Sequence, residues 1–438
     1  IRKSKGLIKM DKKSILILGG GSSQINLIKK SKSMGLFTIL ADINPDAPGR
    51  KFCSKFEKVS TFDYKGALKA AEKNSIDAVA TAGTDQPVFT SAYIAHKLSL
   101  PQFLTPEKAL AVTNKKYMKA VFKSAEIKTA DYILLDKNSK KTDIQVLKPP
   151  FVLKPLDSQG QRGVMKLNTC KDVLSNIEYA LSFSRETSVI LEEYYDSDEI
   201  TLSGWINEGR LYILSVTDRV TFNNFPSIGI CSSHQYPSAY VSSRKDEIIR
   251  LTENIIKAFK IENGPIYFQY LIGKDGIYVN EIACRLGGAY EDEFMPHASG
   301  IDIAEILIKG SLGEKIPDKI FSGIKPSALF FNGEYFTTLL LFSKPGLIKQ
   351  LSFPDYAEQD NNIISAKFII NSNVKINPVA NSTQRAGYAI LKNCNIYNLN
   401  CSIKQFIDNT KIIDDKGLNL LISDFNLLSY KTRRRFSV

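Results

Sequence analysis

Apolar runs of strand length alternate with segments of helical periodicity through the first hundred residues of the chain. The predicted strands and helices, in order, are Ser14 to Leu18, Gln24 to Met34, Phe37 to Ala41, Ala67 to Asn74, Ala78 to Thr81 and Pro87 to Leu98. Regular alternation of this kind predicts a parallel sheet covered by helices. We therefore expect an α/β domain at the start of the chain.

A glycine turn, Gly19-Gly20-Gly21-Ser22-Ser23, joins the first predicted strand to the first predicted helix. Asp42 follows about twenty residues later, where a dinucleotide-binding fold places its ribose-binding acid. A GxGxxG count from Gly19 puts Gln24 where the last glycine should allow close helix packing. A dinucleotide oxidoreductase therefore stays open as one alternative, which bound NADH fluorescence would reveal.

A second glycine-rich loop, Leu156 to Gly163, lies between the predicted strands Phe151 to Pro155 and Val164 to Leu167. Such a loop can fold its backbone N–H groups over phosphate oxygens, while Lys154 directs a positive charge at the same anion. It is not a Walker loop, because no Gly-Lys-Ser/Thr opens a helix behind it. An ordinary mobile hairpin is the alternative interpretation.

Two further predicted strands, Val189 to Leu191 and Glu199 to Ile206, can offer backbone groups to an adenine rim and a carboxylate to a ribose hydroxyl. Surface acids are common on strands, so Glu192 and Glu199 have a structural alternative.

The stretch from Tyr267 to Gly288 reads as two alternating strands around a Lys-Asp-Gly turn. Gln269 and Glu281 then lie side by side and direct oxygen atoms at one place. Magnesium takes oxygen ligands, and the planar fork of Arg285 suits phosphate oxygens. The alternative is a surface hairpin with a solvated Glu–Arg pair.

Composition narrows the class of protein. The 438 residues predict two to four domains, and 43% hydrophobic with 24% charged residues is typical of a soluble, here cytoplasmic, protein. No apolar run reaches the roughly 18 to 20 residues of a membrane span. The six cysteines show no CxxC pair, and the net charge of +13 is spread along the chain apart from Lys431 to Arg435. We expect no membrane and no nucleic-acid partner, and the charge favours anionic small molecules.

After Ile320 the pattern changes to short strands, Ala328 to Asn332 and Ala386 to Leu391, with a terminal helix around Ser402 to Asn409. We interpret this part as a β-rich cap in which the sequence shows no chemistry.

Taken in order, these segments resemble the ATP-grasp superfamily, and most of all one synthetase half of a carbamoyl-phosphate synthase large chain or the related carboxylate–amine ligases. The resemblance covers roughly residues 14 to 315. It rests on the ordered set Gly19-Gly20-Gly21, Asn114-Lys115, Phe151 to Pro155, Leu191 to Tyr194 and Asn280 to Gly288.

The resemblance implies an α/β and α+β fold in four parts. These are a Rossmann-like preceding domain (1–108), a small ATP-grasp subdomain with the phosphate-binding loop (109–190), a large subdomain with the metal and substrate site (191–320) and the small β-rich C-terminal domain (321–438).

It also implies roles for residues at matching positions. ATP phosphates would be bound by Lys115 and Lys154 and by the loop residues Ser158, Gln159, Gly160 and Gly163. Adenosine would be held at Glu192, Glu193, Tyr194, Tyr195 and Glu199. Gln269 and Glu281 would bind Mg²⁺, with Mn²⁺ as an alternative, and Lys154 and Arg285 would stabilise the transferring phosphoryl group.

The region after the adenosine strands faces the acceptor substrate in the family. Arg219 is a candidate clamp for a substrate carboxylate, with a surface Arg–Asp pair as the alternative. His234 is a further candidate in the substrate site, with a loop histidine as the alternative to a catalytic base. Arg285 also lies at the substrate position implied by the resemblance.

Two positions depart from the family pattern. Many members carry Glu where Gln269 stands, although the carbamoyl-phosphate synthases share Gln. Asn is common where Ala283 stands, so one expected metal ligand is missing, and Asn280, Glu291, Asp292 and Glu293 are candidates to replace it.

The function implied is an ATP- and Mg-dependent ligase that activates a carboxylate as an acyl phosphate and couples it to an amine, with release of ADP and phosphate. The partners would be small-molecule carboxylates and amines, and a homodimer is an open alternative to a monomer. Two other functions stay open: a bicarbonate-phosphorylating enzyme of carbamoyl-phosphate or purine-carboxylation type, and a non-catalytic ATP-binding protein.

Overall fold

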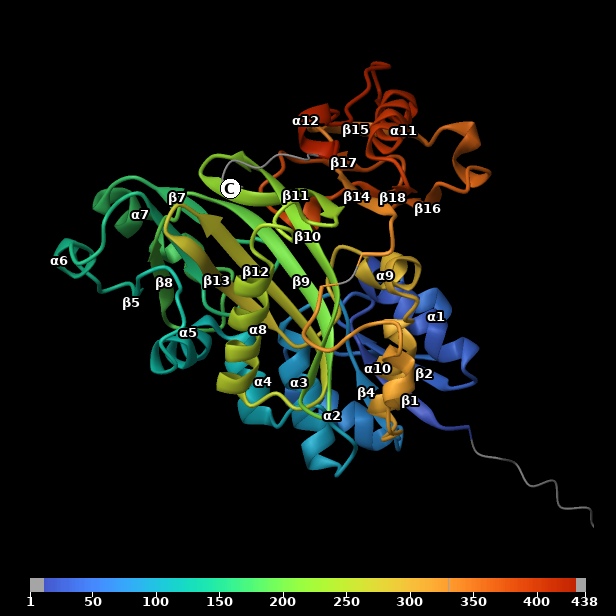
Figure 1. The fold of residues 1–438 in the computed structure, drawn as a ribbon. Coiled ribbons are helices and arrows are strands. Elements are labelled where there is room, and N and C mark those ends of the chain that lie inside the picture. Colours follow the sequence, from blue (N-terminus) through green and yellow to red (C-terminus); the bar gives the residue numbers. More distant parts are fainter. Residues whose placement is uncertain (1–11, 330, 431–438) are drawn as a thin grey trace, which may run out of the picture.

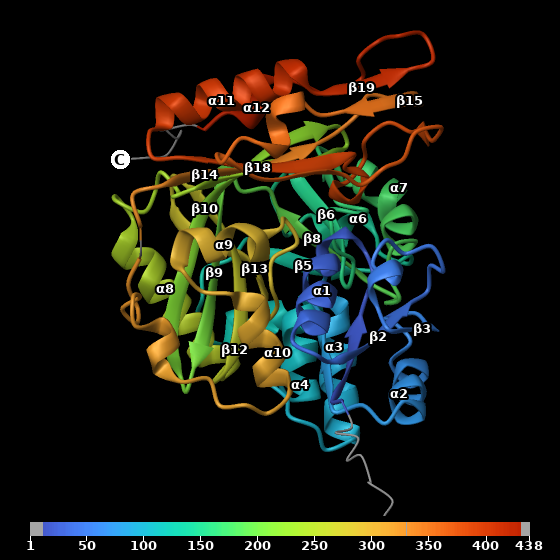
Figure 2. The ribbon, with the colours of Figure 1, turned by 90° about the vertical axis from the view of Figure 1, so that its right-hand side faces the viewer.

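The computed structural model describes residues 12–329 and 331–430 of the chain. It consists of an N-terminal α/β domain, a long central sheet with helices on its faces, and a C-terminal cap above that sheet (Figures 1 and 2). The basic run from Lys431 to Arg435 lies outside the described residues.

The N-terminal domain is built on a parallel sheet of order β3-β2-β1-β4. Its strands are β1 (Ser14–Leu18), β2 (Phe37–Asp42), β3 (Lys55–Lys58) and β4 (Ala78–Ala80), and its helices are α1 (Ile25–Ser33), α2 (Tyr64–Lys73) and α3 (Gln86–Lys97). Every residue of β1 is buried, as expected for a central strand covered on both faces. The predicted parallel sheet is confirmed.

The central sheet has 12 strands, and nine of them follow the order β13-β12-β9-β10-β11-β7-β6-β8-β5. The first half of this region contains α4 (Pro106–Thr113), α5 (Lys115–Ser124), β5 (Tyr132–Leu135), α6 (Lys141–Ile144), β6 (Phe151–Pro155), β7 (Met165–Leu167), α7 (Cys170–Leu181) and β8 (Val189–Glu193). The second half contains β9 (Ser197–Asn207), β10 (Arg210–Asn224), β11 (Ser227–Tyr236), α8 (Lys245–Phe259), β12 (Gly264–Gly273), β13 (Gly276–Ala283), α9 (Glu291–Ser299) and α10 (Ile303–Ser311). The two halves therefore share one sheet, in which β7 of the first half pairs with β11 of the second.

The cap continues the central sheet, because β14 (Tyr335–Leu341) pairs with β11 on one side and with β18 (Gly387–Asn393) on the other. The rest of the cap comprises β15 (Gly346–Ser352), β16 (Ile363–Phe368), β17 (Lys375–Ile376), α11 (Ile396–Asn409), β19 (Lys411–Asp414) and α12 (Phe425–Leu428).

One predicted strand of the cap is wrong. The described residues of Ala328 to Asn332 form no strand, and the first cap strand begins at Tyr335. The Asn332 side chain accepts a hydrogen bond from the Glu334 N–H at 3.0 Å. Such an Asx turn bends the chain and competes with a sheet ladder. The predicted domain boundaries stay predictions.

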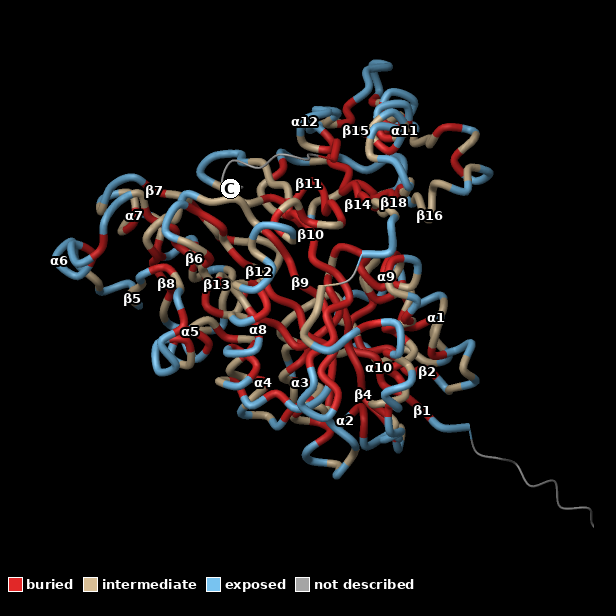
Figure 3. Tube along the Cα trace, viewed as in Figure 1, coloured by how far each residue is buried: buried red, intermediate tan, exposed pale blue. Residues whose placement is uncertain are grey.

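Buried residues form the interior of the N-terminal domain, of the central sheet region and of the cap (Figure 3). One apolar cluster runs from β1 and α1 through α9 and α10 to β14, so the N-terminal domain and the cap are packed against the same body. At that junction the Asn26 amide donates to Asp292 at 2.9 Å. Among the described helices, none combines the length and the apolar character that crossing a membrane requires.

Candidate active site

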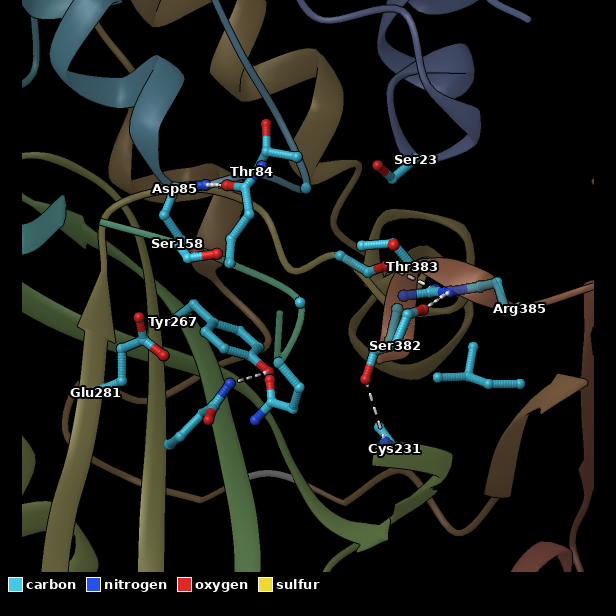
Figure 4. A pocket seen from close by; sticks show the side chains of 18 of the residues that line it. Ser23, Thr84, Asp85, Ser158, Cys231, Tyr267, Glu281, Ser382, Thr383 and Arg385 are labelled. Carbon is cyan, nitrogen blue, oxygen red and sulfur yellow. Dashed lines mark hydrogen bonds between the residues drawn. The ribbon is translucent and has the colours of Figure 1, made fainter. Parts of the chain in front are cut away.

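A cavity of about 320 Å³ lies where the N-terminal domain, both halves of the central sheet and the cap meet. Figure 4 shows Glu281 and Arg385 on opposite sides of it, with Tyr267 between them. The predicted site residues that line it are Lys115, Lys154, Ser158, Gln159, Gly160, Arg219, His234, Gln269, Glu281 and Arg285. Residues far apart in the sequence are thus gathered around one space.

The β12–β13 hairpin carries the oxygen donors. Gln269 and Glu281 are directly opposite each other in the antiparallel register, as predicted. A bulge follows: Tyr270 pairs with Val279, so Asn280 is an extra residue in the ladder. Bulges redirect side chains near functional sites, and here Asn280 and Glu281 both line the cavity.

The hairpin donors fit a hard cation only together with other ligands. The described residues contain no group of three or more His, Cys, Asp or Glu that could hold a metal. Glu281 supplies a carboxylate, and Gln269 and Asn280 supply amide oxygens, the donor type that Mg²⁺ prefers. Mg²⁺ usually takes one or two carboxylates and completes its shell with substrate phosphates and water. The residues present therefore fit a nucleotide-bound magnesium ion.

A buried charge cluster fixes the position of Lys154. The Glu192 carboxylate is paired with Lys154 Nζ at 2.5 Å and with Lys119 Nζ at 2.8 Å. Burial alone would raise the pKa of Glu192, but the two ammonium groups outweigh it and lower that pKa to about 2. Lys154 Nζ also donates to Asn280 Oδ1 at 3.1 Å. Lys154 is thus held at the cavity wall between the two halves of the sheet.

Lys115 faces the Glu281 side of the same cavity. Its Nζ lies 3.7 Å from Glu281 Oε1 and donates to the Ser158 carbonyl at 3.2 Å. Asn114 caps the helix that Lys115 opens, accepting from the Lys116 N–H at 3.0 Å. The cap therefore sets the direction in which the Lys115 side chain leaves the helix.

The glycine-rich loop is packed over the cavity and contacts two other parts of the molecule. Gln159 Oε1 accepts from the Asp85 N–H at 2.8 Å, and the Gly160 carbonyl accepts from the Ser382 N–H at 2.9 Å. The Ser158 hydroxyl is buried in the cavity wall and has no hydrogen-bond partner among the described residues. A buried unpaired hydroxyl costs stability unless a ligand satisfies it, which fits a phosphate oxygen there.

Arg285 is held by the N-terminal domain. Two of its nitrogens reach Asp85 Oδ1 at 2.7 Å, and its guanidinium lies 4.6 Å from the Tyr267 ring centroid. Burial alone would lower the pKa of Arg285, but Asp85 raises it. Ala283 is opposite Tyr267 across the hairpin, so the position of the missing Asn faces an aromatic ring.

Arg219 and His234 are buried and occupy neighbouring strands. Arg219 pairs with Glu199 at 2.5 Å and donates to the Gly229 carbonyl, while Asp218 accepts from Ser238. The surface Arg–Asp pair is therefore wrong, because Arg219 is only 6% exposed and its partner is Glu199.

His234 is a strand residue rather than a loop residue. It lies in β11, and its Nδ1 is within hydrogen-bond distance of the Thr201 and Thr217 hydroxyls. Burial, with help from Arg219 and Arg385, lowers the pKa of His234 to about 3. The imidazole is therefore neutral at neutral pH and a weak proton acceptor.

The other predicted nucleotide residues lie outside the cavity lining. They are Gly163, Glu192, Glu193, Tyr194, Tyr195 and Glu199. Glu193 accepts from the Lys148 N–H at 2.7 Å, and the Tyr195 ring stacks on Tyr278 with centroids 4.1 Å apart. Glu192 and Glu199 support Lys154 and Arg219 from behind. Their roles toward adenosine stay predictions.

Groups of the turn Gly19 to Ser23 and of the residue after it already form hydrogen bonds within the N-terminal domain. Asp42 accepts from the Gly20 N–H at 2.7 Å, and the buried Gln24 amide donates to the Ala82 carbonyl. A ribose would have to displace the first of these bonds. The arrangement disfavours the dinucleotide alternative.

Several cavity residues were not predicted from the sequence. The cap contributes Ser382, Thr383 and Arg385, and the N-terminal domain contributes Ser22, Ser23, Thr84 and Asp85. The cap thus contributes side chains to the cavity, which the sequence did not predict. Ser22 and Ser23 belong to the glycine turn noted in the sequence, whereas the cap residues sit in a short polar segment without a recognisable motif, so only the three-dimensional contact reveals their place at the cavity.

The chain is similar to known proteins with an ATP-grasp domain and to known ligases. A family model described as an ATP-grasp domain matches residues 147–293. Phosphoribosylamine–glycine ligase of Methanococcus vannielii is 25% identical over 64% of this chain and 69% of its own length. The carbamoyl phosphate synthase large chain of Thermoanaerobacter sp. is 24% identical over 45% of this chain, but this match spans only 18% of that protein.

Solved structures agree with the fold. L-amino acid ligase from Bacillus licheniformis superposes with a TM-score of 0.77 at 16% identity, covering 92% of this chain and 99% of that chain. The biotin carboxylase domain of 2-oxoglutarate carboxylase from Hydrogenobacter thermophilus, solved with MgADP and bicarbonate, gives a TM-score of 0.72 at 16% identity, covering 91% and 90%.

Residues 147–293 of the chain match an ATP-grasp domain, and the relatives of the chain are ligases that form carbon–nitrogen bonds. The predicted family, fold class and enzyme class are confirmed, and so are ATP and Mg²⁺ as the cofactors of this family.

Proposed function

We propose that this chain phosphorylates a substrate carboxylate with ATP and couples the resulting acyl phosphate to an amine, releasing ADP and phosphate. The observation that carries the proposal is the convergence of Lys115, Lys154 and Arg285 with the Gln269–Glu281 pair on one cavity.

Electrostatics explains why these groups are needed. A carboxylate that attacks the γ-phosphate meets negative charge, so cations must screen both reactants before they approach. Lys115 and Lys154 face the nucleotide side, and Arg285 is oriented by Asp85 toward the reacting groups. Magnesium, held through Glu281 with the amides of Gln269 and Asn280, would neutralise phosphate charge.

Exclusion of water supports the same chemistry. An acyl phosphate is a good electrophile, and water would consume it before an amine arrived. The Ser158–Gly163 loop closes the cavity by bonds to both Asp85 and Ser382. The amine would take the acyl group, phosphate would leave, and the excess proton would pass to solvent or phosphate, because neutral His234 is a weak base.

The test is a screen for ADP release over pairs of carboxylates and amines with Mg-ATP. Lys154→Ala should lose at least about 100-fold in turnover, because it removes a cation from the transferring phosphoryl group. Lys171→Ala, an exposed lysine on α7, is the matched control and should behave as wild type. Equal turnover in wild type and Lys154→Ala would identify the activity as contamination, and no nucleotide binding at millimolar ATP would reject the proposal.

A bicarbonate-phosphorylating enzyme is the second candidate, favoured by Gln269 and by the similarity to a carbamoyl phosphate synthase large chain. Bicarbonate-dependent ADP release without any other carboxylate would support it. Tight ATP binding without turnover in any arm would instead point to a non-catalytic nucleotide-binding protein, consistent with Ala283. The homodimer stays a prediction.

A further inference from the structure

Three arginines line the cavity, and they differ in their partners. Arg219 is paired with Glu199 and Arg285 with Asp85. Arg385, from the cap, has no carboxylate within ion-pair distance among the described residues. A partly buried cation without a counter-ion is costly unless an anion from outside completes it.

The Arg385 side chain is held ready for such an anion. Its Nε donates to the Ser382 carbonyl at 3.1 Å and its Nη1 to the Gly288 carbonyl at 3.0 Å. Its guanidinium lies 5.6 Å from the centroid of the Tyr290 ring. These contacts fix the plane of the guanidinium and leave part of its donor fork for a ligand.

The surroundings of Arg385 are themselves rigid. Tyr290 stacks on Tyr388 with ring centroids 3.4 Å apart, and its hydroxyl is 3.0 Å from the Ser22 hydroxyl. Glu293 of α9 pairs with Lys367 at 3.1 Å. Glu291 accepts from the Ala289 N–H with one carboxylate oxygen, while its other oxygen is buried without a hydrogen-bond partner among the described residues. The charges of Arg285 and Arg385 act on Glu291, but no described carboxylate lies within ion-pair distance of Arg385.

The position of Arg385 separates it from phosphoryl transfer. Figure 4 places it across the cavity from Glu281, beside Ser382 and Thr383. The reacting carboxylate must lie near Arg285 and the nucleotide, so an anion at Arg385 belongs to a different group of a substrate. The Ser382 N–H also donates to the Gly160 carbonyl, so this end of the cavity is in contact with the closed loop.

We propose that Arg385 binds a second, non-reacting anionic group of a substrate, a carboxylate or a phosphate, and thereby selects substrates that carry one. This inference rests on the proposed ligase function and names its substrate class. Arginine suits the role because its planar fork pairs with two oxygens of a carboxylate or phosphate at once.

The experiment measures equilibrium binding by calorimetry to the full chain saturated with Mg-ADP. The probes are L-alanine, L-alaninamide, which keeps the ammonium group and lacks the carboxylate, and inorganic phosphate. The variants are Arg385→Gln and Arg385→Lys, with Arg250→Gln, an exposed arginine on α8, as the matched control. Melting temperatures of all variants report on folding.

We expect Arg385→Gln to weaken binding of an anionic probe by about 10-fold to 100-fold, the loss typical of a charge-assisted hydrogen bond. Arg385→Lys should fall between wild type and Arg385→Gln, because it keeps the charge and loses the fork. Binding of L-alaninamide, which lacks the carboxylate, should be the same in all variants, and Arg250→Gln should match wild type. An effect on L-alanine alone assigns a carboxylate, and an effect on phosphate alone assigns a phosphate.

Two results overturn the proposal: wild-type affinity for both anionic probes in Arg385→Gln, or no binding of either probe to wild type at millimolar concentration. Failure here is distinct from failure of the ligase function. Binding is measured without turnover. If the protein is an active ligase and its affinity for the anionic probes does not depend on Arg385, only this inference is contradicted and the ligase function is not.

Discussion

The two ends of the cavity are built on different principles. At the nucleotide-facing end, charges come in compensated sets: Glu192 lies between Lys119 and Lys154, and Lys115 faces Glu281. At the cap-facing end, Arg385 donates to two backbone carbonyls and lies beside the Tyr290 ring, with no carboxylate within ion-pair distance among the described residues.

The difference indicates which kind of ligand each end of the cavity would bind. Compensated charges can be held without ligand and need only rearrange when a triphosphate and its metal arrive together. A cation whose close partners are neutral carbonyl groups can be neutralised by an anion that brings no metal ion. On the two proposals made above, the same cavity would combine a site for a metal–nucleotide complex with a site for an anionic group that carries no metal ion.

The largest effect should come from breaking the buried charge set. Glu192→Gln leaves two ammonium groups facing each other in a buried site, so the free energy of unfolding should fall by about 3–5 kcal/mol. Chemical denaturation measures it. Glu193→Gln is the matched control, because Glu193 is only partly buried and holds one bond to the Lys148 N–H. Equal losses of unfolding free energy in the two variants would show that the ion pairs of Glu192 do not contribute more to stability than the single hydrogen bond of Glu193.

The second effect concerns the metal. Glu281→Gln removes the carboxylate from the β12–β13 hairpin, and Mn²⁺ affinity in the presence of ADP should drop roughly 10- to 100-fold. Paramagnetic resonance of free Mn²⁺ reports this without turnover. The exposed Glu262, replaced by Gln, is the control. Unchanged Mn²⁺ affinity in Glu281→Gln would move the metal site away from this hairpin.

The smallest effect tests the contact that joins the two ends. Gly160 has φ of +67°, and an added Cβ would lie 2.7 Å from Thr383 Cγ2. Gly160→Ala should cost about 1–2 kcal/mol in the closed loop from its left-handed backbone alone, which is roughly a 5- to 30-fold loss of kcat/KM for ATP.

The contact with the Thr383 methyl should add to this backbone cost. Thr383→Ser removes the methyl group, so the double variant should recover only the added part of the loss, while Thr383→Ser should change little by itself. If the double variant is no better than Gly160→Ala, the loop and the cap do not meet during turnover.

Prediction from the sequence succeeded where local pattern decides the structure. The strand Phe151–Pro155 follows from a short apolar run in front of a glycine-rich loop. The facing of Gln269 with Glu281 follows from period-two alternation around a tight turn. The long strands β10 and β11 were not predicted. The cap-facing end also could not be predicted, because Arg385, Gly288 and Ser22 come together only through packing of three separate segments.

The central claim is that one cavity holds the triphosphate between Lys154 and the Glu281 hairpin. The most direct measurement is a crystal structure with magnesium and a non-hydrolysable ATP analogue. We expect phosphate oxygens within hydrogen-bond distance of Lys115 and Lys154 and a metal ion on Glu281. A nucleotide bound elsewhere, with Lys154 still paired only to Glu192 and Asn280, would contradict it.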